Sequence, residues 1–191
     1  PDGTVMLMDA RSRSEGTHAR LLAAAERLVL REGAARLTLD AVAKEAGVSK
    51  GGLLYHFPGK GDLISEMVEH LAMERFEREV EERVSGTEPG EWVRAYVEAT
   101  FEPADEDRNA AVRSGLFAAV ANDPSLLGPI RERYEVLQER AENDGVDPAA
   151  ATVARLASDG LWFLELFDIP GVEGELRERV QARLVALAGE S

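Results

Sequence analysis

The sequence predicts an all-α protein of about nine helices, with a three-helix head at the N-terminus and a larger helical body behind it. Apolar residues recur at intervals of three and four along most of the chain, and no segment alternates apolar and polar residues as a half-buried strand does. Glycine, proline and capping residues interrupt this pattern where helices should end. We expect a disordered arm at residues 1–13, which show no periodicity, a head at 14–61 and a body at 62–191.

The helices of the head are predicted from caps and turn glycines. Apolar residues over 21–29 have helical spacing, and Gly33 follows where a left-handed C-terminal cap belongs. Thr38 and Ser49 stand as N-caps of the second and third helices, because their hydroxyls can accept a hydrogen bond from a free backbone N–H. Gly47, between those two helices, permits a tight turn with positive φ.

The body is predicted as one long helix followed by four or five others. The long helix runs from about residue 62 to 84 and ends at a Ser-Gly-Thr sequence. Asp147 and Pro148 mark a later helix start, as a cap followed by proline at the first helical position. The further helices are expected at about residues 92–101, 112–120, 126–141, 148–167 and 173–188.

Charge is unevenly divided along the chain. The formal net charge is −14, yet residues 11–60 hold nine basic and five acidic residues. From residue 71 onward there are 13 arginines and 26 acidic residues. A basic head on an acidic body would approach a polyanion head first, and the acidity also keeps the body soluble.

Composition excludes several classes of protein. With no cysteine and three scattered histidines, we expect no disulfide, no metal site and no cofactor. No apolar run reaches the roughly 18 residues of a membrane span, and no cationic leader precedes an apolar stretch. We therefore expect a cytoplasmic protein that does not enter a membrane.

Residues 37–64, LTLDAVAKEAGVSKGGLLYHFPGKGDLI, contain all three lysines of the chain and predict a helix-turn-helix. This motif needs a supporting helix, a tight turn and a second helix whose first residues face DNA base edges. Lys50 opens the second helix and can reach a phosphate or the acceptor atoms of guanine. Tyr55 and His56 offer hydrogen-bonding groups to phosphate, and Lys60 adds a cation at the start of the fourth helix.

This segment resembles the TetR family of bacterial regulators, because it matches the family's Thr–(helix)–AGVS–xxxLYxHFxxKxxL signature nearly residue for residue. The match runs from Leu21 to Met67, and the rest of the chain is similar only as a helical body of the usual length. The resemblance implies core roles for Leu53 and Phe57, whereas Gly59 departs from it, because members usually have a Ser or Asn cap there. It implies DNA contacts by Thr38, Ser49, Lys50, Gly51, Gly52, Tyr55, His56 and Lys60.

A homodimer is the second implication of the resemblance. Helix-turn-helix proteins usually read two half-sites related by a two-fold axis, which a symmetric dimer matches. In the family, the last two helices of each subunit form a four-helix interface, here roughly residues 148–167 and 173–188. Packing of these apolar stripes on their own subunit is the alternative. The candidate interface residues are Leu156, Gly160, Leu164, Val180, Leu184 and Leu187.

A pocket for a small-molecule effector, enclosed by helices four to eight, is the third implication. Ordinary core packing is the alternative for every candidate residue. Few of the candidates are cationic, which favours a neutral, lipophilic or aromatic effector. The apolar and aromatic candidates are Met67, Trp92, Tyr96, Phe101, Phe117, Trp162, Phe163 and Phe167, and the polar ones are His70, Asn122 and Asp159.

Together these features predict a homodimeric repressor that leaves a palindromic double-stranded DNA operator when a small, mainly apolar effector binds. The fourth helix, common to the head and the pocket wall, would transmit the signal. A regulator without a small-molecule effector, acting through a protein partner or constitutively, is the first alternative. A small helical enzyme is the second, and it is disfavoured because the sequence shows no Ser/His/Asp grouping and no glycine-rich phosphate loop.

Overall fold

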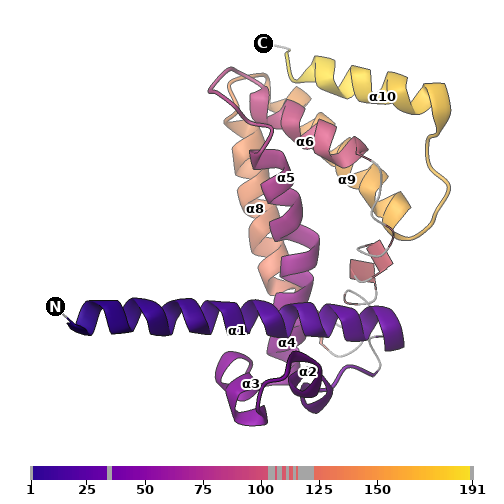
Figure 1. The fold of residues 1–191 in the computed structure, drawn as a ribbon. Helices are drawn as coiled ribbons and strands as arrows, with labels where there is room; N and C mark the ends of the chain where they lie inside the picture. The colour runs from indigo at the N-terminus through magenta and orange to yellow at the C-terminus, as the bar shows by residue number, and fades with distance from the viewer. Residues whose placement is uncertain are drawn as a thin grey trace. The chain divides into compact units, whose positions relative to one another are not determined.

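The computed structural model describes residues 2–33, 36–102, 106, 109–110, 112–113, 115 and 123–189. These ranges form helices joined by turns and loops, and they contain no strand (Figure 1). The prediction of an all-α fold is therefore confirmed. Within the same ranges, every helix is too short or too polar for a membrane span.

The chain divides into two compact units, each with its own core. Residues 1–68 and 114–127 form the first unit, and residues 69–113 and 128–191 form the second. We call the first unit the head and the second the body.

The head is built on α1 (Asp2–Glu32), α2 (Leu39–Ala46), α3 (Lys50–His56) and α4 (Lys60–Glu69). α1 packs along α2, and α2 packs against α3 across the turn between them (Figure 1). Burial of apolar surface is the dominant favourable term that holds such helices together. The largest fully buried side chains of the head are those of Leu21, Val29, Leu37, Val42, Leu53, Phe57, Leu63, Ile64 and Met67.

The N-terminus differs from the sequence prediction. Residues 2–13 are the first turns of α1, where the sequence predicted a disordered arm. The segment from residue 2 to 32 contains no proline, and many of its residues are Ala, Leu, Met, Arg and Glu, which lose little entropy in a helix. Once the turns around Leu21 are packed, adding further turns needs no new nucleation.

The boundary of the head also lies later than predicted. Leu63, Ile64 and Met67 of α4 are almost completely buried in the head core. The first two turns of α4 therefore belong to the head, whose first segment ends at Val68 and not at residue 61, and residues 114–127 form its second segment.

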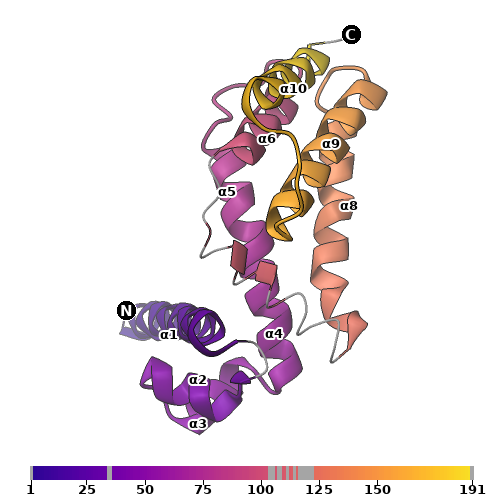
Figure 2. The same cartoon turned by 90° about the vertical axis from the view of Figure 1, so that its right-hand side faces the viewer.

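The body contains α5 (Arg75–Glu81), α6 (Glu91–Phe101), α8 (Gly128–Glu142), α9 (Pro148–Leu166) and α10 (Gly174–Leu187). α6 packs against α5, α9 and α10, and α8 packs along α9; Figure 2 shows these helices from the side. A short 3₁₀ turn, η3 (Pro124–Leu127), precedes α8 in the chain. The Asp147 carboxylate caps α9 by accepting from Ala150 N–H at 3.0 Å, as the sequence predicted. The helix predicted at 112–120 lies largely outside the described residues.

The long fourth helix is interrupted by a feature that the sequence did not predict. Between α4 and α5, residues His70–Glu74 form a π-helical segment, η2. Such a segment inserts an extra residue into a helix and is often found at functional sites. No glycine or proline occurs within it, so its sequence carries no signal of the change.

Gly90, directly before α6, lies where the body permits no side chain. Its φ is +76°, a region that favours glycine, and a Cβ there would lie 1.6 Å from the Ala188 carbonyl oxygen. The Gly90 N–H donates to the Asp144 carbonyl at 2.7 Å. Gly90 thus lets the start of α6 and the end of α10 meet through their backbones.

Gly90→Ala is expected to lower the free energy of unfolding by about 2–3 kcal/mol, because the new methyl group must displace the backbone at Ala188. Urea unfolding measures the change. Gly16→Ala in α1 is the matched control, since nothing lies within 4 Å of its Cβ position. Equal stabilities of the two variants would contradict this account of the packing.

Candidate functional site

The helix-turn-helix of the head is held by two hydroxyl caps and one left-handed glycine. Ala41 N–H donates to the Thr38 hydroxyl at 3.2 Å, and Gly52 N–H donates to the Ser49 hydroxyl at 3.1 Å. Gly47 has a φ of +65° and closes α2. The three local predictions are confirmed. Because each cap uses a lone pair of its hydroxyl oxygen, each hydroxyl hydrogen remains able to donate to a phosphate.

α3 presents a cation and an aromatic ring to solvent. Tyr55 is 80% exposed, although a tyrosine without another role is normally at least partly covered. Lys50 is also exposed, and its Nζ lies 2.9 Å from Asp40 Oδ1. An exposed ion pair of this kind contributes little stability, so Lys50 can exchange Asp40 for a DNA group at small cost. The pairing of Lys50 with Asp40 was not predicted from the sequence.

The two glycines of α3, Gly51 and Gly52, differ in the space that a side chain would find at each position. A Cβ on Gly51 would meet nothing within 4 Å, so the head itself does not exclude a side chain there. A Cβ on Gly52 would lie 2.9 Å from Val48 Cγ1 and 3.2 Å from the Ser49 hydroxyl oxygen. Packing inside the head therefore accounts for Gly52, and close approach to DNA remains the prediction for Gly51.

His56 belongs to an aromatic cluster rather than to the open surface. Its ring centroid lies 5.7 Å from that of His18 and 5.2 Å from that of Tyr55. The His18 ring stacks on Phe57 at 5.1 Å, and its Nε2 lies 2.5 Å from Glu66 Oε1. The half-buried His56 thus supports the exposed Tyr55, and neither His18 nor Glu66 was identified from the sequence.

Desolvation lowers the pKa of His56 below its ordinary value of 6.5, the His18 ring lowers it further, and Glu66 opposes the shift. The folded head therefore binds this proton less readily than the unfolded chain does. The stability that His56 contributes is present above about pH 6.5 and is lost as the pH falls through the folded pKa.

Urea unfolding at pH 7.5 and 5.5 should show this loss. His56→Asn is expected to lose less stability between the two pH values than the wild type, because asparagine does not titrate. An identical pH dependence of the wild type and His56→Asn would contradict the prediction.

Lys60 opens α4, which has no hydroxyl cap. The Gly59 carbonyl accepts from Leu63 N–H at 3.3 Å. A serine or asparagine side chain at Gly59 would add a hydrogen bond at this helix start. Lys60 is half-exposed at the positive end of the helix dipole, where a phosphate is also attracted.

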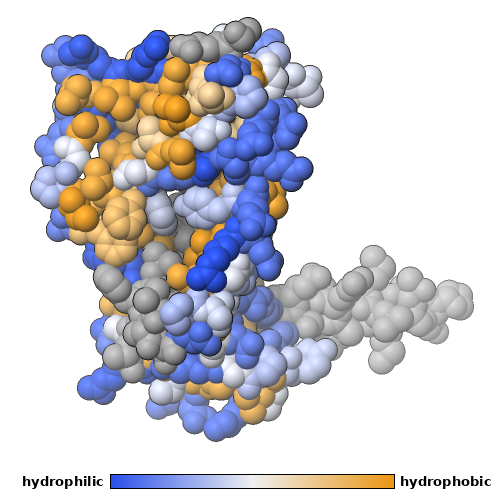
Figure 3. Space-filling view, turned by 180° about the vertical axis from the view of Figure 1, so that it is seen from behind, coloured by the Kyte–Doolittle hydropathy of each residue, from blue (hydrophilic) through white to orange (hydrophobic). Residues whose placement is uncertain are grey.

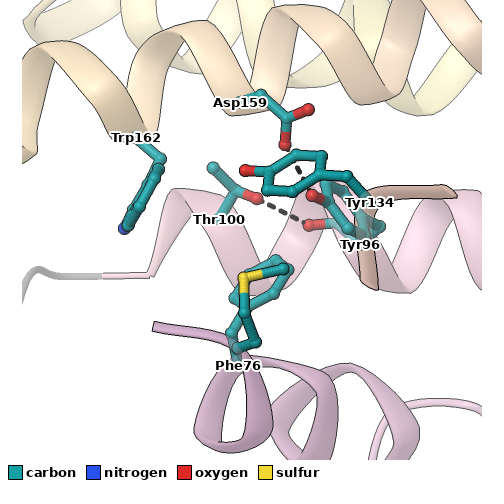
Figure 4. Close-up of a pocket in the computed structure, with 7 residues that line it drawn as sticks. Phe76, Tyr96, Thr100, Tyr134, Asp159 and Trp162 are labelled. Carbon is teal, nitrogen blue, oxygen red and sulfur yellow. Dashed lines mark hydrogen bonds between the residues drawn. The ribbon is translucent and has the colours of Figure 1, made fainter. Parts of the chain in front are cut away.

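The body encloses a small pocket between α5, α6, α8 and α9 (Figure 4). The cavity volume open to a water-sized molecule is about 20 Å³. This is far below the roughly 300–1,000 Å³ of small-molecule sites, so an organic ligand would have to displace side chains. The lining residues are Met73, Phe76, Tyr96, Thr100, Tyr134, Asp159 and Trp162.

Three of the residues predicted for the pocket line it, namely Tyr96, Asp159 and Trp162. Four other lining residues were not predicted, because nothing in their local pattern distinguishes them from core or surface residues. Those four are Met73, Phe76, Thr100 and Tyr134.

The other predicted pocket residues lie elsewhere. Met67 is buried in the head core, and His70 Nδ1 lies 2.7 Å from Glu74 Oε2. Trp92 packs beside Tyr96, with ring centroids 5.2 Å apart. Phe101 lies beneath the Arg177 guanidinium. Phe163 is half-exposed and contacts Phe167. Phe117 and Asn122 lie outside the described residues.

A polar network forms one side of the pocket. The Tyr96 hydroxyl donates to Asp159 Oδ1 at 2.5 Å, and Arg155 Nη1 donates to Asp159 Oδ2 at 2.6 Å. Arg155 also donates from Nε and Nη2 to Gln138 Oε1, at 3.0 and 2.8 Å. Burial raises the pKa of Asp159, and the hydrogen bond from Tyr96 and the charge of Arg155 oppose that rise. Burial also raises the pKa of Tyr134 to about 12, so its hydroxyl stays protonated.

α9 carries an exposed apolar stripe on the body. Val153, Leu156 and Phe163 are each about half-exposed at helical spacing, and Gly160 lies between the last two. Figure 3 shows an apolar area on the body, in the upper part of the view. Of the other predicted interface residues, Leu164, Val180 and Leu187 are partly exposed, whereas Leu184 is buried within its own chain.

Family comparisons match both units. Residues 21–67 match the bacterial regulatory proteins of the tetR family, and residues 90–189 match the tetracyclin repressor-like C-terminal domain. Over 66 residues the chain is 33% identical to the HTH-type transcriptional regulator TtgR of Pseudomonas putida. This aligned region covers 35% of the present chain and 31% of TtgR. The match thus spans about a third of that relative's length.

Solved structures are similar over nearly the whole chain. A TetR family member from Streptomyces coelicolor A3 is 26% identical with a TM-score of 0.66, over 90% of this chain and 97% of that one. The multidrug binding protein EbrR, complexed with malachite green, is 25% identical with a TM-score of 0.61, over 89% and 96% of the two chains. Because the C-terminal family model alone covers more than half of the chain, and the N-terminal model covers the helix-turn-helix, the protein belongs to the TetR family of DNA-binding transcriptional regulators.

Proposed function

We propose that this protein is a cytoplasmic, homodimeric repressor that binds a palindromic operator and releases it when a small, mainly apolar aromatic molecule enters the body. The pocket between α5, α6, α8 and α9 is the observation that carries this proposal. Four of its seven lining residues are aromatic, and none is basic. An apolar aromatic ligand would replace water against these rings without leaving a buried charge unpaired.

The proposed DNA-binding surface is the exposed face of α3 together with the N-termini of α2, α3 and α4. Lys50 and Tyr55 extend into solvent, and the capping hydroxyls of Thr38 and Ser49 lie at free helix N-termini. Backbone N–H groups at such ends attract phosphates. Lys60 and His56 complete the set, the first as a phosphate contact and the second as the support for Tyr55.

The proposed dimer forms through the exposed apolar stripe on α9, and α10 contributes further contacts. Apolar side chains at Leu156 and Phe163 stay half-exposed in the single chain, and contact with a second copy would cover them. Gly160 would let the two α9 helices approach closely, and Leu164, Val180 and Leu187 would extend the contact. A two-fold interface of this kind places two heads on two half-sites.

The proposed release of the operator requires that the ligand and the operator bind preferentially to different conformations of the protein. Met73, in the π-helical segment, and Phe76, in α5, both line the pocket. A ligand that displaces them acts on the same helical run that begins at Lys60. EbrR supports the aromatic character of the ligand but not its charge, since it is described in a complex with malachite green, an aromatic cation.

Selection of operators from random DNA by the full-length protein tests the proposal. We expect a palindromic site, and we expect added bicyclic aromatic compounds to weaken binding to it. Phe76→Trp, which fills the pocket, should reduce the response to ligand while the operator site stays the same. A non-palindromic site would contradict the dimer, and operator binding that no aromatic compound alters would favour a regulator without a small-molecule effector.

A further inference from the structure

The walls of the pocket are suited to a flat ring. The Phe76 and Tyr96 rings meet edge to face, with centroids 4.9 Å apart at 84°. Trp162 and Tyr134 lie on other sides of the same space (Figure 4), and Met73 of the π-helical segment also lines it. Edge and face contacts with aromatic rings are favourable beyond the area that they bury.

The polar atoms of the pocket mostly accept hydrogen bonds. The Thr100 hydroxyl already donates to the Tyr96 carbonyl at 2.9 Å, and the Tyr96 hydroxyl donates to Asp159. Each hydroxyl has one hydrogen, so only acceptor lone pairs remain on these two oxygens. A ligand at this end of the pocket therefore needs a hydrogen to donate.

The Asp159 carboxylate can accept a hydrogen bond from the ligand, but it does not require a positively charged ligand. Its two oxygens accept one hydrogen bond each, from Tyr96 and from Arg155, and a carboxylate has lone-pair sites for about four. Arg155 balances its charge and is itself held by Gln138. A cationic ligand would be desolvated without meeting an unpaired anion, and a carboxylate ligand would meet Asp159 and no basic lining residue.

Tyr134 supplies the complementary donor. Its hydroxyl points into the pocket in Figure 4, and it makes no hydrogen bond to the residues that the structure describes. A hydroxyl donor covered by a ligand without an acceptor would cost free energy, because its hydrogen bond to water would be lost. The ligand therefore needs an acceptor beside its own donor.

We propose that the pocket takes an uncharged aromatic ligand with a ring hydroxyl, a phenol, whose O–H donates to Asp159 and whose oxygen accepts from Tyr134. One hydroxyl group meets both requirements, and the ring would lie between Phe76, Tyr96 and Trp162 after these side chains move apart, because the open volume is only about 20 Å³. This inference rests on the proposed function, since it names the ligand class of the same pocket.

Equilibrium dialysis of the full-length protein against four matched probes tests the inference: 2-naphthol, 2-methoxynaphthalene, naphthalene and 2-naphthoate. We expect 2-naphthol to bind about 10-fold more tightly than naphthalene, in keeping with one or two net hydrogen bonds, and 2-methoxynaphthalene, which keeps only the acceptor, to fall between the two. Binding of 2-naphthoate should be the weakest, because its carboxylate faces Asp159.

Tyr134→Phe removes only the hydroxyl, so the fold should be retained. We expect this variant to bind 2-naphthol about 5-fold to 10-fold less tightly and naphthalene as the wild type does. Tyr55→Phe in the head is the matched control and should bind every probe unchanged. Equal binding of 2-naphthol and naphthalene, tighter binding of 2-naphthoate, or no effect of Tyr134→Phe would overturn the phenol while leaving an aromatic pocket intact. Failure of all four probes to bind would overturn the proposed aromatic effector as well.

Discussion

Tyr55→Ala is expected to abolish specific operator binding while the protein stays folded and dimeric. Tyr55 is 80% exposed and its ring contributes little to the head core, so its removal should not unfold the chain. Loss of one good DNA contact costs about 1–3 kcal/mol, and a dimer loses it at both half-sites. Affinity for the operator should therefore fall about 30-fold or more, measured by fluorescence anisotropy at fixed salt.

Lys50→Ala should have an effect of the same order, because Lys50 opens the reading helix and its partner Asp40 can be exchanged. Lys44→Ala is the matched control. Lys44 is an exposed lysine on the supporting helix α2, and it should be nearly silent. Footprints retained by both Tyr55→Ala and Lys50→Ala would refute the assignment of these DNA contacts.

Leu156→Glu is expected to convert the dimer to a monomer and thereby to lose operator binding. Leu156 is 54% exposed in the single chain, so the monomer can place a carboxylate there in water. At an interface with a second copy, the same carboxylates would be buried and would face each other across the two-fold axis, which costs several kcal/mol. Sedimentation equilibrium should show a shift from dimer to monomer at micromolar concentration.

Val136→Glu provides the comparison for the interface. Val136 is 57% exposed on α8, and it is not part of the stripe on α9. This variant should remain dimeric and should bind the operator as the wild type does. A dimeric Leu156→Glu, or a monomeric Val136→Glu, would move the interface away from α9.

The features predicted correctly from the sequence depend on local chemistry. Thr38, Ser49 and Gly47 act within one helical turn, so their roles as caps and turn can be read from their immediate neighbours. The same holds for Asp147 at the start of α9. Fold class followed as well, because periodic apolar spacing is a property of each segment alone.

The features that could not be predicted depend on tertiary packing. Tyr134 and Thr100 reach the pocket only because α8, α6 and α9 pack together, and neither residue differs locally from a core or surface residue. Trp92 and Phe101 looked equally suitable, yet both are covered by arginine guanidinium groups. His18, more than 30 positions from His56 in the sequence, was likewise invisible to local patterns.

The ion pair between Lys50 and Asp40 has a consequence for how the protein searches DNA. Asp40 competes with DNA for the Lys50 ammonium group, so the proposed contact of Lys50 with a phosphate would begin with the displacement of Asp40. The exchange costs little, because an exposed ion pair contributes little stability. If Lys50 contacts DNA as proposed, an unrelated sequence would gain slightly less from Lys50 than from an unpaired lysine, and Asp40 would thereby disfavour sites that engage nothing else of α3.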